Sequence, residues 1–138
     1  MKHYRMTYAV PLFPMKIKKQ PLELEYKIWI PCEAVGDSVD EHITQLLSLA
    51  GGMTEEQVSG VWISESGETV QEDVHLLSFI SPDAEANLLI RGRIDSLVEL
   101  LLEEGQEAVL ISEGGHHFLI SGEVEEVNRN IKFSWRKV

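Results

Sequence analysis

The chain has 138 residues, of which 43% are hydrophobic and 25% charged, a composition typical of one folded domain and not of a disordered chain. With 12 Lys and Arg against 23 Asp and Glu, the formal net charge is −11, which excludes a general nucleic-acid binder because phosphate binding needs a basic surface. The single cysteine, Cys32, excludes an internal disulfide and a cysteine-rich zinc site. No apolar run approaches the roughly 20 residues of a membrane span, and the first residues lack a signal-peptide pattern, so we expect a cytoplasmic protein without a membrane partner.

The charges are spread unevenly along the chain. Residues 1–20 hold five basic and no acidic residues, whereas residues 21–104 hold three basic and 18 acidic residues. Three prolines interrupt the basic segment, which is typical of an extended linker or an edge strand. We therefore expect a basic, proline-containing arm or edge strand over 1–24 and one domain over 25–138.

Alternating and helical patterns predict the first two elements. Alternation over 25–30 predicts a strand that Pro31 ends. A helix is predicted over 36–50, because Ser38 and Glu41 have capping-box spacing and the apolar residues that follow recur on one face. The glycine pair after this helix favours its termination.

A hairpin and a second helix follow. Strands are predicted over 60–64 and 70–81, joined by a turn in which Gly67 takes the positive-φ position. Ser81 as cap and Pro82 as first residue indicate a second helix, ending near Gly105. Three further strands are predicted over 108–112, 118–121 and 130–135.

The order of these elements predicts the fold class. A β-α-β-β-α-β order predicts an α+β, ferredoxin-like (split β-α-β) antiparallel sheet with two helices on one face and extra terminal strands. Two helices cannot cover both faces of the sheet. The open face would include Trp29, with Leu77 as a further candidate, and an apolar face of this kind predicts a homodimer and an unknown protein partner.

A set of spaced residues resembles a known pattern. The chain is similar to a family of small, largely uncharacterised bacterial and phage proteins with a GG-x-T / G-x-W / E / Q-E-x-V signature. The resemblance runs from about Glu25 to Leu119 and implies a compact α+β domain of ferredoxin-like kind, without implying any catalytic residue. The residues that carry it are Gly51-Gly52-x-Thr54, Gly60-x-Trp62, Gly67, Glu72 and Gln106-Glu107-Ala-Val109.

Four residues of this pattern are candidates for a ligand site. Trp62 precedes the predicted hairpin and Glu72 follows it, so the two side chains can meet on paired strands. With Thr54 and Gln106 they would form a small polar pocket with a tryptophan wall. The alternative is structural: a capping threonine, a core tryptophan, and polar side chains that bond the backbone.

Two adjacent acidic residues are candidate metal ligands. Glu72 and Asp73 supply the hard oxygen ligands that calcium prefers, but no EF-hand loop is present. The five histidines show none of the spacings typical of zinc sites. We expect no resident cofactor, with calcium as the cation that the acidic residues would suit; the alternative is a solvated acidic surface.

No enzymatic motif is apparent. The chain has no dinucleotide-binding glycine pattern, no phosphate-binding loop and no nucleophile elbow. The sequence therefore favours a non-enzymatic protein-interaction module that acts through its exposed sheet face or acidic surface. The alternative function is an acidic cation-binding or small-ligand-binding protein, and an enzyme ranks third because compact α+β sheets host many activities.

Overall fold

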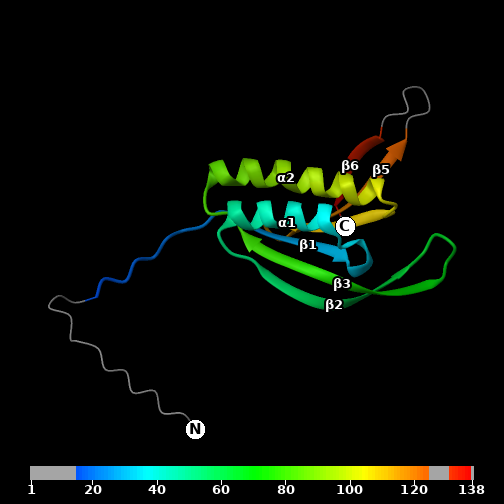
Figure 1. The fold of residues 1–138 in the computed structure, drawn as a ribbon, viewed down its shortest axis with the longest axis horizontal. Helices are drawn as coiled ribbons and strands as arrows, with labels where there is room; N and C mark the ends of the chain where they lie inside the picture. Colours follow the sequence, from blue (N-terminus) through cyan, green and yellow to red (C-terminus); the bar gives the residue numbers. More distant parts are fainter. Residues whose placement is uncertain (1–14, 125–130, 138) are drawn as a thin grey trace, which may run out of the picture.

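The computed structural model describes residues 15–124 and 131–137. The predicted β-α-β-β-α-β order is confirmed, with two more strands after it and a short 3-10 helix after the first strand (Figure 1). The elements are β1 (Glu25–Pro31), η1 (Cys32–Ala34), α1 (Asp37–Ala50), β2 (Thr54–Ile63), β3 (Thr69–Ile80), α2 (Ala84–Glu103), β4 (Ala108–Glu113), β5 (His116–Val124) and β6 (Ile131–Lys137).

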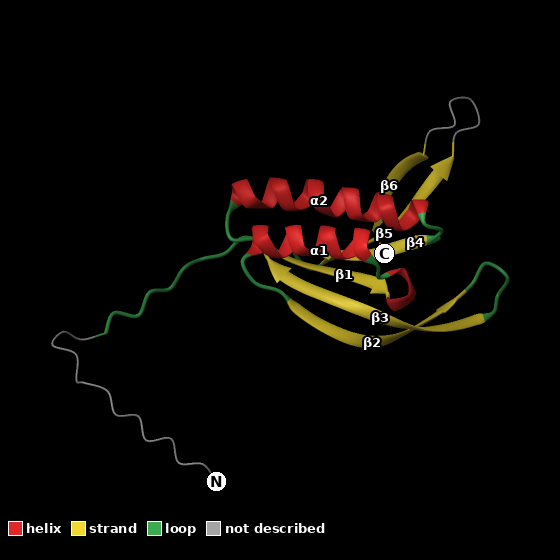
Figure 2. Cartoon of the chain, in the orientation of Figure 1, coloured by secondary structure: helices red, strands yellow, loops and turns green. Residues whose placement is uncertain are grey.

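The strands form one antiparallel sheet. Its order within the described residues is β2-β3-β1-β4-β5-β6, and each neighbouring pair is antiparallel. Because β3 pairs with both β1 and β2, it splits the β1-α1-β2 unit, which is the ferredoxin-like arrangement that the sequence predicts. Both helices lie on the same side of the sheet (Figure 2), so the other side is an open face.

The described part of the segment before β1 does not form the edge strand that was one of the two alternatives predicted for it. Residues 15–24 contain no strand, and the rest of the predicted basic arm lies outside the described residues. The end of this segment is held against the end of β3, because Glu23 N donates to Ser81 O and Ser81 N donates to Leu24 O, both at 2.8 Å. The extra strands that the structure describes are thus β5 and β6, at the other end of the chain.

The hydrophobic core fills the space between the helices and the sheet. One face of β1 and the apolar stripes of both helices supply most of it, as expected from the two periodicities. The placement of Leu77 on the open face was wrong: Leu77 is 1% exposed and belongs to the core, whereas Leu76 lies opposite Trp29. The buried hydrophobic residues include Tyr26, Ile28, Ile30, Val39, Leu46, Leu77, Phe79, Ile90, Ile94, Leu97, Leu101, Val109, Ile111 and Ile120.

The helix starts also differ from the prediction. Helix α1 begins after Gly36, and no side chain caps it, so the predicted capping box of Ser38 and Glu41 is wrong. Helix α2 is capped by Asp83, whose carboxylate accepts a hydrogen bond from Ala86 N at 2.8 Å, in place of the predicted Ser81. In the described part of the chain, no helix combines the length and apolar character needed to cross a membrane.

Removing the observed cap should cost more than removing the predicted one. We expect Asp83→Ala to lower the free energy of unfolding by about 1 kcal/mol, because it leaves a helix N–H without its acceptor. Ser38→Ala should change it by less than about 0.5 kcal/mol, as for an exposed residue without a defined contact. Urea unfolding of both variants measures this, and equal losses would contradict the observed caps.

Candidate functional site

A concave site lies on the open face of the sheet, near the end of β1. We call it the open-face pocket; its cavity has a volume of about 290 Å³. Strands β1 to β5 all contribute to its walls, together with the segment that leads into β4. The residues that line it are Trp29, Pro31, Gly60, Val61, Trp62, Glu72, Val74, Gln106, Glu107, Ala108, Leu110 and Leu119.

Three of the four candidate ligand-binding residues line this pocket. The register of the β2–β3 hairpin pairs Gly60 with Glu72 and Trp62 with Val70, so Trp62 and Glu72 are diagonal neighbours on one face. Gln106 reaches the same pocket from the segment before β4. The structure therefore brings together two residues of a local hairpin and one residue from a distant part of the sequence.

The fourth candidate, Thr54, lies elsewhere. It begins β2 and pairs with Ser78, at the far end of the strand from Trp62. There it lines a separate hollow with residues that follow α1, including Gly52 and Met53. Thr54 and the other three candidates do not share a pocket.

Glu72 is the acidic residue of β3 inside the pocket, and its surroundings change its titration. Burial raises the pKa of the Glu72 carboxyl above its usual value, and the negative charge of Glu33 raises it further. Gly60, directly opposite, has no side chain to cover the carboxyl. Glu72 therefore combines partial desolvation with access from the pocket, which is a common property of residues at functional sites.

The surroundings of the Cys32 thiol, close to Glu72, do not activate it as a nucleophile. Burial raises the pKa of Cys32, and the charges of Asp73 and Glu72 raise it further. The thiol of Cys32 therefore favours its protonated form at neutral pH.

The two proposed calcium ligands do not converge. Glu72 and Asp73 are consecutive residues of β3, so their side chains point to opposite faces of the sheet. Glu72 lines the open-face pocket, and Asp73 is not part of its wall. Across residues 15–124 and 131–137, no group of three or more His, Cys, Asp and Glu side chains could hold a metal ion. Calcium binding stays a prediction.

Sequence reasoning missed most of the apolar wall. Trp29 was expected on the open face but not in a pocket, and Glu107 was read only as part of the resemblance. Leu110 and Leu119 alternate with core residues on β4 and β5, and they pair directly across these strands. The alternation shows that they share a face, but only the sheet order places that face beside Trp62.

Comparisons with known proteins give the fold a precedent. No protein-family model and no curated protein matches the chain. A solved structure of a phage S-adenosylmethionine (SAM) lyase in the apo state is similar, with a TM-score of 0.51 and 19% identity over 82% of this chain and 100% of that one. A phage SAM lyase in complex with S-methyl-5'-thioadenosine aligns with a TM-score of 0.48 and 11% identity, over 90% of this chain and 97% of that one.

These findings correct the prediction of a non-enzymatic interaction module. That prediction was wrong: it rested on missing motifs and on the open apolar face, yet a protein with this fold is a lyase. Short catalytic motifs need not appear in a site assembled from several strands, because its residues are distant in sequence. The open face contains a pocket with a partly desolvated carboxyl, while the homodimer and the protein partner stay predictions.

Proposed function

We propose that the protein is an enzyme that cleaves S-adenosylmethionine, or a closely related sulfonium nucleoside, in the open-face pocket. The observation that carries the proposal is the presence of two tryptophans and Glu72 in one cavity. The fold shared with a phage SAM lyase supports it. A sulfonium nucleoside has a flat aromatic base and a permanent positive charge, and this pocket offers a complementary surface for each.

The aromatic residues suit the base and the cation. Trp62 is 40% exposed, so its ring is accessible to a ligand, and base–aromatic stacking contributes about 1–3 kcal/mol per base. An aromatic ring face also attracts a cation within about 6 Å, and tryptophan does so best. Trp29 lies on the same face of the sheet, so the pocket offers two such rings.

The charges of the pocket suit a cationic ligand. Glu72 and Glu107 line it, and among the side chains that the structure describes no lysine or arginine does. Gln106 adds an amide that can both donate and accept hydrogen bonds, as recognition of a base edge requires. The cavity is near the lower end of the range of about 300–1,000 Å³ for ligand pockets, so the base and sulfonium would occupy it while the rest of the ligand stays more open.

Glu72 is the residue on which we propose that cleavage depends. We propose that the bond breaks by elimination: the electron pair of the carbon–sulfur bond remains on sulfur, which leaves as a neutral thioether, while the adjacent carbon of the chain loses a proton and its C–H electrons form a carbon–carbon double bond. Glu72 in its ionised form stabilises the bound cation and accepts this proton. Its raised pKa brings the carboxylate closer to the basicity that general-base catalysis near neutral pH requires.

Two substitutions on neighbouring residues test this proposal. Incubation of the wild-type protein with SAM should release S-methyl-5'-thioadenosine, measured by chromatography. Glu72→Gln preserves size but removes charge and basicity, and should lower the rate by about 10²–10⁴-fold. Asp73→Asn removes the same charge from the adjacent residue, which faces away from the pocket, and should leave the rate within about twofold of wild type, since it lies outside the cleft.

Three results of this experiment would contradict the proposal. Release of no thioether by the wild-type protein would overturn the proposed activity. Turnover that Glu72→Gln leaves intact would place the reaction outside this pocket. An equal loss in Asp73→Asn would show that the effect is one of overall charge.

A further inference from the structure

A second cavity lies on the helix side of the sheet, away from the open-face pocket. It has a volume of about 290 Å³ and lies between α2 and the strands β1, β4 and β5. Its walls combine three charged side chains with apolar ones. The residues that line it are Tyr26, Arg91, Ile94, Asp95, Ile111, Glu113 and Phe118.

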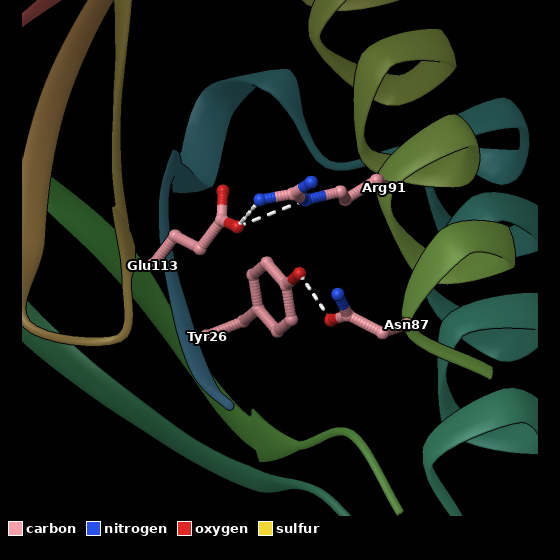
Figure 3. Close-up of polar contacts among 4 residues, drawn as sticks. All are labelled: Tyr26, Asn87, Arg91 and Glu113. Atoms are coloured by element: carbon pink, nitrogen blue, oxygen red, sulfur yellow. Dashed lines mark hydrogen bonds and ion pairs between the residues drawn. The ribbon is translucent and has the colours of Figure 1, made fainter. Parts of the chain in front are cut away.

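The polar side of this cavity is held in place by contacts between α2 and the sheet (Figure 3). Arg91 binds Glu113 through Nε, at 2.9 Å from Oε1, and through a second nitrogen of the guanidinium. Tyr26 donates a hydrogen bond to Asn87 Oδ1 at 2.5 Å. These contacts hold a guanidinium, a carboxylate and a phenol side by side, and such preorganisation lowers the cost of binding.

The described side chains of the cavity carry unequal charges. Among them, Arg91 is the cation, and Glu113 and Asp95 are the anions. Among the described residues, the ion pair of Arg91 goes to Glu113 and none reaches Asp95, one helical turn further along α2. Burial raises the pKa of Asp95, and the charge of Glu113 raises it while Arg91 opposes the shift. A positive charge placed here would therefore find a carboxylate that forms no ion pair with another described residue.

The guanidinium has capacity for an anion. Arginine has five N–H donors; the contacts to Glu113 engage two of its three nitrogens, and Tyr26 also interacts with the guanidinium. The Arg91 side chain is 52% exposed, so its outer edge can be approached, whereas Glu113 is 15% exposed. A ligand carboxylate could thus bind Arg91 without displacing Glu113.

We propose that this cavity binds a free α-amino acid as its zwitterion. The ammonium group lies against Asp95, the carboxylate binds Arg91, and an apolar side chain packs against Ile94, Ile111 and Phe118. The site is separated by the sheet from the open-face pocket, so the proposal does not rest on the proposed SAM activity.

The test uses L-leucine as the probe, with the full chain and isothermal titration calorimetry. Isoamylamine lacks only its carboxylate and isocaproate lacks only its ammonium group, so these two molecules measure the contribution of each charge. We expect saturable binding of L-leucine and affinity at least about tenfold lower for each analogue, because each loses one charge-assisted contact. An analogue that binds as tightly as L-leucine would overturn recognition of the zwitterion, and no binding of L-leucine at millimolar concentration would overturn the site.

Two variants of α2 locate the binding. Asp95→Asn should weaken L-leucine binding by about tenfold or more, since it removes the acceptor charge and preserves the shape. Glu99→Gln removes an exposed carboxylate one turn further along α2, outside the cavity, and should leave the affinity unchanged. Urea unfolding checks that both variants fold. Equal affinity in Asp95→Asn and wild type would overturn the assignment, and so would equal losses in the two variants.

Discussion

Replacing Leu77 by alanine is expected to lower the free energy of unfolding by about 2–5 kcal/mol, the range for a buried leucine that leaves a cavity. Leu77 is 1% exposed and, in the part of β3 that pairs with β1, lies opposite Ile28, which is fully buried in the same core. The side chains around Leu77 are held between the helices and the sheet, so they can move little to fill the cavity that the truncation leaves. The loss should therefore fall in the upper part of this range.

Leu76→Ala is the matched control, one residue earlier on the same strand. Its side chain lies on the open face opposite Trp29 and is partly exposed, so truncation should cost about 1 kcal/mol. Urea unfolding of the two variants measures the difference. If Leu76→Ala proved the more damaging, β3 would face the other way in solution and the open-face pocket would lose its walls.

This pair also shows where sequence patterns are ambiguous. In β3 both faces carry large apolar residues, so alternation identifies two sets of residues without saying which set faces the helices. The choice follows from register: Leu77 pairs with Ile28, and Tyr26, Ile28 and Ile30 all lie beneath the helices. Element types and order could be predicted because they depend on local periodicity, whereas the orientation of β3 depends on packing.

In the candidate site, too, the positions of some residues follow from local sequence, whereas the positions of others depend on how the elements pack. Trp62 and Glu72 could be predicted as neighbours because a short hairpin fixes their register. Thr54 shares a strand with Trp62 but lies about 26 Å from it along an extended chain of about 3.3 Å per residue, too far for one small pocket. Gln106 meets Glu72 only through the sheet order, in which β1 lies between β3 and β4. The Arg91–Glu113 pair depends on how α2 packs on β4, which no spacing in the sequence encodes.

Introducing a side chain at Gly60 should block the proposed reaction more completely than any change at the rim of the pocket. Gly60 lies opposite Glu72, and a Cβ added there would be 3.1 Å from Val74 Cγ2 and 3.9 Å from the Glu72 backbone oxygen. The branched side chain of Gly60→Val would therefore project onto the open face, within the cavity and beside the Glu72 carboxyl. We expect kcat/KM for SAM to fall by about a hundredfold, because displacing a ligand by about 1 Å has an effect of that size.

The fold should tolerate Gly60→Val, so a fall in kcat/KM would be caused by the altered pocket and not by unfolding. Valine is favoured in strands, and the tight contact with Val74 should lower the free energy of unfolding by about 1–3 kcal/mol at most. Ser59→Val places the same side chain on the opposite face of β2, where Ser59 is exposed and accepts a hydrogen bond from Gln71. It should leave kcat/KM nearly unchanged. If Gly60→Val folds and still cleaves SAM at the wild-type rate, the substrate does not enter between Gly60 and Glu72, and the active site lies elsewhere on the molecule.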